Sequence, residues 1–178
     1  MAKRNLFGTD GVRGVVNVQI TSKLALSLGA AASIFFDGRL PEHARRLVAV
    51  AWDPRVSSEM IAAALGAGFM ETGVSVDLLG VLPTPGLALI LARETKYMAG
   101  AMISASHNPP EYNGIKFFGA GGHKLADEDE EAIEGNLGLV ELANPSRVHG
   151  DEVGGAHRVD DACDRYLSFV QENNPGLS

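Results

Sequence analysis

The chain has 178 residues, of which 46% are hydrophobic and 21% charged, and its formal net charge is −7. This length suits one full domain with an appendage and is too short for two large domains. The acidic balance argues against a nucleic-acid or anionic-membrane binder, which needs clustered Lys and Arg. No run approaches the roughly 20 apolar residues that span a bilayer, and the first residues lack the apolar stretch of a secretory signal. Cys163, the only cysteine, cannot form an internal disulfide, so we expect a cytoplasmic protein.

Helix-like and strand-like segments alternate in the first half, which is typical of an α/β layer architecture. The helices are indicated by apolar residues at helical spacing, and the strands by short apolar runs. The predicted elements are a helix over residues 21–36 capped by Thr21, a buried strand over 47–51, a helix from Ser57 or Ser58 to Gly73, a strand over 75–79, and a helix capped by Thr84 and ending near Thr95.

The second half continues the alternation. The predicted elements are strands over residues 99–103 and 114–118, a helix that begins in the acidic run 127–131, an irregular segment over 138–156, and a last helix capped by Asp160. The acidic run suits the positive end of a helix dipole. A metal site there is disfavoured, because consecutive helical positions do not face each other.

A polar loop directly follows the strand predicted at 99–103. It contains Ser106, His107 and Asn108 and is braced by two prolines, and Lys116 follows ten residues after Ser106. Catalytic residues often lie on loops held by rigid elements, although an ordinary polar turn has a similar composition. We therefore interpret this loop as a candidate active-site edge.

Three other turns combine Gly or Pro with reactive groups. Residues 7–14 hold three glycines and Arg13, whose planar fork suits phosphate, although a surface loop with a solvated arginine is the simpler reading. Asp53-Pro54-Arg55 predicts a turn at a strand end with a local ion pair of little energetic value. Residues 119–125 predict a flexible turn more simply than a phosphate cradle.

A serine hydrolase is the competing enzyme class. It needs a base within reach of the serine and a third group that orients the base. The sequence has no Gly-x-Ser-x-Gly elbow. His107 directly follows Ser106, an arrangement that seldom gives a relay geometry, so this class is disfavoured.

In their order along the chain, these motifs resemble the α-D-phosphohexomutase family, and most closely its bacterial phosphoglucosamine mutase branch. The matching segments are residues 7–14, 82–85, 104–109, 113–118 and 122–125. The resemblance runs from Leu6 to about Tyr166. It implies a three-layer α/β/α fold with a mixed sheet between helices and Ser106 at a cleft edge. It also implies that residues 1–157 form the family's first domain and that residues 158–178 lead into a second domain.

The resemblance implies that Ser106 is phosphorylated and passes its phosphoryl group to a hexosamine phosphate through a bisphosphate intermediate. The implied reaction interconverts glucosamine 6-phosphate and glucosamine 1-phosphate for cell-wall precursors. Arg13, Lys116 and Asn108 would bind phosphate, and Lys116 is also the candidate general acid or base. His107 would bond phosphate, aid proton transfer or simply support the loop. The implied cofactor is Mg²⁺, with one ligand oxygen from Ser106.

Parts of the family's machinery are absent from this sequence. The family has four domains, and its Asp-Gly-Asp magnesium loop and its sugar- and phosphate-gripping loops do not occur here. We therefore expect the chain alone not to turn over without the remaining domains. A phosphomannomutase or phosphoglucomutase, and a stand-alone, non-catalytic phosphosugar-binding module, stay open as alternatives. Trp52 stands where the family usually has a basic residue before Asp-Pro-Arg, which puts any role for that turn in doubt.

Overall fold

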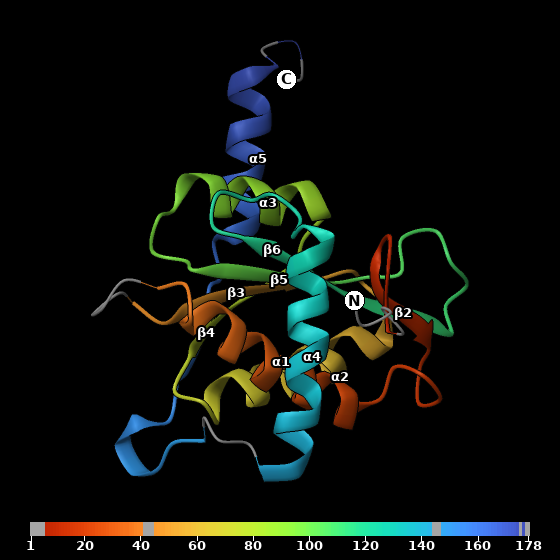
Figure 1. Ribbon diagram of the computed structural model, residues 1–178. Coiled ribbons are helices and arrows are strands. Elements are labelled where there is room, and N and C mark those ends of the chain that lie inside the picture. The colour runs from red at the N-terminus through yellow and green to blue at the C-terminus, as the bar shows by residue number, and fades with distance from the viewer. Residues whose placement is uncertain (1–5, 41–44, 144–146, 175, 177–178) are drawn as a thin grey trace.

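In a computed structural model, which describes residues 6–40, 45–143, 147–174 and 176, strands form one mixed sheet between two layers of helices (Figure 1). The strand order is β1-β2-β6-β5-β3-β4-β7. The strands are β1 (Phe7–Gly8), β2 (Gly11–Val15), β3 (Leu47–Trp52), β4 (Ser75–Val81), β5 (Ala99–Ile103), β6 (Tyr112–Gly119) and β7 (Ala156–Arg158). Residues 1–5, on which the expectation about a secretory signal depends, lie outside the described part.

β3 is an interior strand of the sheet and is buried along its whole length. It pairs in parallel with β4 on one side and with β5 on the other. β6 and β2 then continue the sheet in antiparallel pairing. A strand covered on both faces needs apolar residues at every position, which explains its continuous Val and Ala run.

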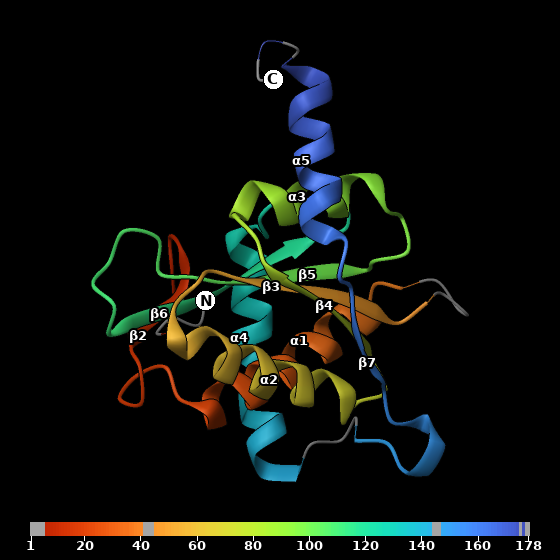
Figure 2. The same cartoon turned by 180° about the vertical axis from the view of Figure 1, so that it is seen from behind.

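Helices cover both faces of the sheet (Figure 2). One layer contains α1 (Ser22–Asp37), α2 (Val56–Met70) and α4 (Asp127–Ala143); the other contains α3 (Thr84–Arg93) and α5 (Ala162–Asn173). A separate apolar cluster fills each interface between helices and sheet. This arrangement confirms the predicted three-layer α/β/α fold. None of the helices described is long and apolar enough to cross a membrane.

Two glycines let α1 and α2 approach each other closely. A Cβ atom added at Gly29 would lie 2.2 Å from the carbonyl oxygen of Leu65, and one added at Gly68 would lie 2.0 Å from that of Leu26. At each glycine, the position that a side chain would occupy is filled by a backbone carbonyl of the other helix. Any larger residue at either glycine must push the helices apart.

The predicted helix starts are partly confirmed. The Thr21 hydroxyl accepts from the Leu24 N–H at 3.1 Å, as expected of an N-cap. The predicted Thr84 cap is wrong, because Pro83 is the N-cap and Pro85 lies within the first turn, where a missing N–H needs no intrahelical partner. The cap of α5 is Asp161 rather than Asp160.

The segment predicted to be irregular, residues 138–156, contains regular elements in its described parts, 138–143 and 147–156. α4 continues to Ala143, and a 3₁₀ turn, η1 (Gly150–Glu152), precedes the edge strand β7. β7 is exposed at every residue and joins β4 through backbone pairing. Because its order depends on main-chain hydrogen bonds and not on buried side chains, no apolar pattern marks it in the sequence.

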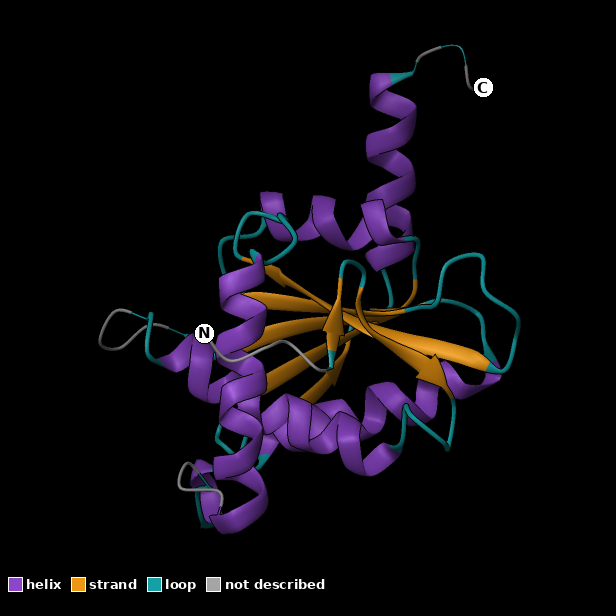
Figure 3. Ribbon diagram, turned by 45° about the vertical axis from the view of Figure 1, so that its right-hand side comes forward, coloured by secondary structure: helices purple, strands orange, loops and turns teal. Residues whose placement is uncertain are grey.

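The last helix, α5, stands out from the rest of the molecule (Figure 3). Its first turn is anchored by the buried Ala162. Tyr166 packs near Gly86 of α3, and the Arg93 guanidinium lies 4.5 Å from the centre of the Phe169 ring. Leu167 is 50% exposed. The predicted apolar face therefore exists but is only half covered.

Candidate active site

The loop between β5 and β6 presents Ser106 to solvent. Ser106 has a φ of 56°, in the left-handed region that costs a residue with a side chain about 1–2 kcal/mol. Its N–H donates to the Ser104 hydroxyl at 2.9 Å, and its Oγ lies 3.3 Å from Nδ1 of His107. Strained backbone of this kind often occurs at functional sites, where the surrounding structure holds it in place.

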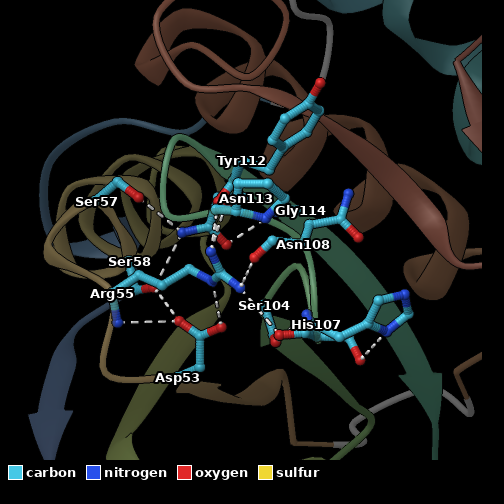
Figure 4. Close-up of polar contacts among 12 residues, drawn as sticks. Asp53, Arg55, Ser57, Ser58, Ser104, His107, Asn108, Tyr112, Asn113 and Gly114 are labelled. Atoms are coloured by element: carbon cyan, nitrogen blue, oxygen red, sulfur yellow. Dashed lines mark hydrogen bonds and ion pairs between the residues drawn. The ribbon is translucent and has the colours of Figure 1, made fainter.

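The Arg55 side chain binds the backbone of this loop (Figure 4). Its Nη2 donates to the carbonyl oxygens of Ser106 and Asn108, both at 2.9 Å. Its Nη1 donates to the carbonyl oxygens of Pro109 at 2.8 Å and Tyr112 at 3.2 Å. Nε completes the set with a bond to Asp53. The donors of the guanidinium therefore all bind either the loop backbone or the Asp53 carboxylate.

Asp53 fixes the orientation of Arg55. Its Oδ2 accepts from Nε of Arg55 at 2.9 Å, and its Oδ1 accepts from the Ser58 hydroxyl at 2.8 Å. Burial raises the pKa of the Asp53 carboxyl. Hydrogen bonds from Ser104, Ser58 and Arg55 outweigh burial, so the pKa lies below its ordinary value. The carboxylate is therefore ionised at neutral pH and available to Arg55.

The lowered pKa of Asp53 makes the stability of the protein depend on pH. A carboxylate whose pKa is lower in the folded state stabilises that state at neutral pH, and the contribution is lost as the pH falls below about 4. We expect Asp53→Asn to lower the free energy of unfolding by about 1–3 kcal/mol at pH 7. Urea denaturation should show that the difference in free energy of unfolding between wild type and Asp53→Asn becomes smaller toward pH 3. A difference that stays constant with pH would contradict a lowered pKa for Asp53.

Asn113 connects the start of β6 to the start of α2. Its fully buried amide donates to the hydroxyls of Ser57 at 2.9 Å and Ser58 at 3.0 Å, and its Oδ1 accepts from the Gly114 N–H. Neither serine is the N-cap of α2, because the helix begins at Val56 with Arg55 as its N-cap and both serines lie within its first turn. The serine hydroxyls serve the site and not the helix end.

A second polar cluster lies on β2 and β6. Arg13 pairs with Gly114 across the ladder, so Arg13 and Lys116 lie on the same face. Nη1 of Arg13 donates to Oδ1 of Asn108 at 3.3 Å. The Asp10 carboxylate lies 3.7 Å from Nη2 of Arg13 and 3.5 Å from Nζ of Lys116. One acidic group therefore holds two cations beside the loop.

Arg13 keeps an unused donor. Its Nε is buried and has no hydrogen-bond partner within the described part of the chain. A buried donor without a partner is costly, and guanidinium groups bind phosphate oxygens well. Because Nε is buried, an anion that binds Arg13 must do so through the rest of the side chain, which is 21% exposed.

The structure brings most of the predicted site residues together. His107 contacts Ser106 directly, and Arg13 reaches the loop through Asn108. No contact within the described residues joins Lys116 to Ser106; Lys116 is held through Asp10. Residues 119–125 form a tight turn at the other end of β6, away from the loop.

Arg55 is the residue that sequence reasoning missed. The local ion pair predicted for the Asp53-Pro54-Arg55 turn is confirmed, since Nε of Arg55 lies 2.9 Å from Oδ2 of Asp53. The sequence did not predict that most of the Arg55 bonds go to a loop about fifty positions later. The one available signal was the residue type, since arginine carries five donors in a rigid fork. Trp52 takes no part in these contacts and is buried in the core.

The described residues hold no complete donor set for a metal. Among them, no three His, Cys, Asp or Glu side chains come close enough to hold an ion. The Ser106 hydroxyl offers one oxygen, and Mg²⁺ prefers several oxygens in octahedral geometry. The described residues alone therefore do not form a magnesium site.

Comparisons with known proteins identify the family of the chain. A family profile described as phosphoglucomutase/phosphomannomutase, alpha/beta/alpha domain I, matches residues 4–141. A curated phosphoglucosamine mutase of Desulforamulus reducens is 47% identical, with 96% of this chain and 37% of the relative covered. One of Corynebacterium efficiens is 48% identical, with 96% and 38% covered. The chain thus spans a little over a third of these relatives.

A solved structure supports the fold. The crystal structure of a phosphoglucomutase/phosphomannomutase family protein from Burkholderia thailandensis superimposes with a TM-score of 0.80 at 23% identity, covering 97% of this chain and 36% of that chain. This likeness concerns the layer arrangement, and the family profile covers the loop and both of its flanking strands. The chain belongs to the phosphoglucomutase/phosphomannomutase family and carries its α/β/α domain I.

Proposed function

We propose that this chain is the phosphoserine-bearing part of a phosphoglucosamine mutase, which interconverts glucosamine 6-phosphate and glucosamine 1-phosphate. The observation that carries the proposal is the exposed Ser106 hydroxyl on a strained, clamped loop, with the Arg13 guanidinium held nearby through Asn108. Phosphoserine carries a charge of about −1.5 to −2 at neutral pH, so cations at this site favour it. The curated relatives support glucosamine phosphate as the substrate.

In the proposed step, a hydroxyl oxygen of the sugar phosphate attacks the phosphorus of phosphorylated Ser106, and the bond between phosphorus and Oγ breaks. The sugar hydroxyl loses its proton to a base, for which Lys116 is the candidate, and Oγ gains a proton as it leaves. Nδ1 of His107, 3.3 Å from Oγ, is placed to deliver that proton. The other phosphoryl group of the bisphosphate then returns to Ser106.

Positioning and charge neutralisation supply most of the rate in phosphoryl transfer. Arg13, Lys116 and Asn108 are the proposed phosphate ligands of this chain. Ser106 would contribute one oxygen to Mg²⁺, which when bound neutralises phosphate charge and orients the transferred group. We propose that the other magnesium ligands belong to protein beyond this chain.

We also propose that residues 1–157 form one domain and that residues 158–178 lead into another. The projection of α5 away from the sheet and its half-covered apolar face support this division (Figure 1). Cys163 as the only cysteine is consistent with the proposed cytoplasmic location.

The test is substrate conversion by the intact protein that carries this chain. With Mg²⁺ and a trace of hexosamine 1,6-bisphosphate, we expect glucosamine 6-phosphate to yield glucosamine 1-phosphate, as followed by ³¹P NMR. Tryptic mass spectrometry should place phosphate on the peptide that contains Ser106. A higher kcat/KM for glucose or mannose phosphates would replace the sugar assignment. No conversion of any of them would favour a binding module.

A further inference from the structure

We infer that Arg55 is a positioning residue for the phosphoserine, acting through the loop backbone and not through the phosphate. The inference builds on the proposed function of Ser106. The four carbonyl oxygens that Arg55 binds belong to Ser106, Asn108, Pro109 and Tyr112, so they span the loop from its nucleophile to the first residue of β6.

Arg55 sets the direction of the peptide unit that follows Ser106. In a trans peptide the C=O and the next N–H point in opposite directions, and no cis peptide occurs among the described residues. Because the Ser106 carbonyl points at Arg55, the His107 N–H points away from it. This places a backbone donor on the side of the loop opposite the guanidinium, where it can meet a phosphate oxygen.

The clamp also holds Ser106 in its left-handed conformation. A residue with φ of 56° returns to ordinary backbone angles unless its neighbours prevent it. Arg55 binds the carbonyls of Ser106 and Asn108 with one nitrogen, which ties the two ends of the strained turn together. The two prolines that follow have no N–H with which to support the loop, so the carbonyl contacts provide the anchoring.

Lysine cannot replace this arrangement. An ammonium group carries the same charge but lacks the planar fork that reaches four carbonyls and a carboxylate at once. The Arg55 side chain is only 14% exposed, and that of Asp53 16%. A lysine at this position would therefore leave several of these carbonyl oxygens without a side-chain donor, and the loop would lose contacts that fix its backbone.

The experiment compares Arg55→Lys with Arg46→Lys in the intact protein that carries this chain. Arg46 is a matched control, since its Nε binds Asp37 at 2.9 Å and its Nη2 binds the Thr72 carbonyl at 2.8 Å, far from the loop. We expect Arg55→Lys to lower kcat about 10- to 100-fold with KM within about twofold. Hydrogen exchange of the amides in residues 104–114 should accelerate. Arg46→Lys should leave both kcat and the amide exchange of residues 104–114 unchanged.

Asp53→Asn provides the second variant. It leaves Arg55 in place but loosens its orientation, so we expect a smaller fall in kcat and a smaller acceleration of amide exchange. In the double variant with Arg55→Lys, the two effects on kcat should be less than additive. Thermal unfolding verifies that each variant is folded. Unchanged loop exchange in folded Arg55→Lys overturns the inference, as does faster exchange with unchanged kcat. If the wild type converts no sugar phosphate, the proposed function fails, while the exchange comparison still decides whether Arg55 clamps the loop.

Discussion

Ser106→Ala in the intact protein that carries this chain is expected to lower kcat for the proposed reaction by about 1,000-fold or more, because the side chain is the proposed carrier of the transferred phosphoryl group. KM for the sugar phosphate should change little, since Arg13 and Lys116 remain in place. The measurement is steady-state conversion of glucosamine 6-phosphate together with mass spectrometry of the phosphorylated peptide. Phosphate incorporation should disappear with the activity.

Ser106→Gly separates the role of the hydroxyl from that of the strained backbone, and Ser168→Ala is the control. Ser106→Gly also lacks the hydroxyl but adopts positive φ at no steric cost, so it should be as inactive as alanine and at least as stable. Ser168→Ala, at an exposed position on α5, should retain full activity. An active Ser106→Gly enzyme would show that the strained backbone matters and the hydroxyl does not, which would contradict the phosphoserine assignment.

Gly68→Ala is expected to lower the free energy of unfolding by about 3 kcal/mol, the upper end for overpacking a tight core. The added Cβ would lie 2.0 Å from the Leu26 carbonyl oxygen, so α1 and α2 must move apart. In a chain of this size the loss corresponds to a fall in Tm of about 6–12 °C. Urea denaturation and thermal unfolding both measure it.

Gly66→Ala in the same helix is the matched control. Its Cβ would meet only Cγ1 of Val76, at 3.9 Å. We expect it to be neutral or to stabilise the helix by up to about 1 kcal/mol, because alanine favours helix more than glycine does. Equal stability of the two variants would mean that the helices accommodate the methyl group, and that their close approach is not required.

The fold was largely predictable because its buried elements leave periodic patterns in the sequence. β3 is apolar at every position, and α1 shows helical spacing with a threonine cap. Element boundaries were less predictable. The serines near residue 57 suggest a helix cap, yet their hydroxyls bond Asn113 and Asp53, partners that only the folded chain brings within reach. Tertiary partners therefore overrode a sound local preference.

The site was predictable in its residue types and not in its geometry. Ser106, His107 and Arg13 stand out in the sequence because polar and glycine-rich turns follow or flank apolar strands, and the structure places the three residues near one another. The role of Arg55 was not predictable, because its partners are mostly backbone carbonyls, and a carbonyl carries no residue-specific signal. β7 escaped prediction because all of its residues are exposed, so no apolar pattern marks it in the sequence.

The long sequence separations within the site have a consequence for folding. Arg55 and the Ser106 carbonyl are 51 positions apart, and Arg13 and Asn108 are 95 apart. Contacts this distant form late, after β2, β3, β5 and β6 have come together. An incompletely folded chain therefore displays the serine without its clamp or its cations. Incorporation of phosphate at Ser106 would then report completed folding. Nascent or damaged molecules would remain unphosphorylated and could not take part in the proposed phosphoryl transfer.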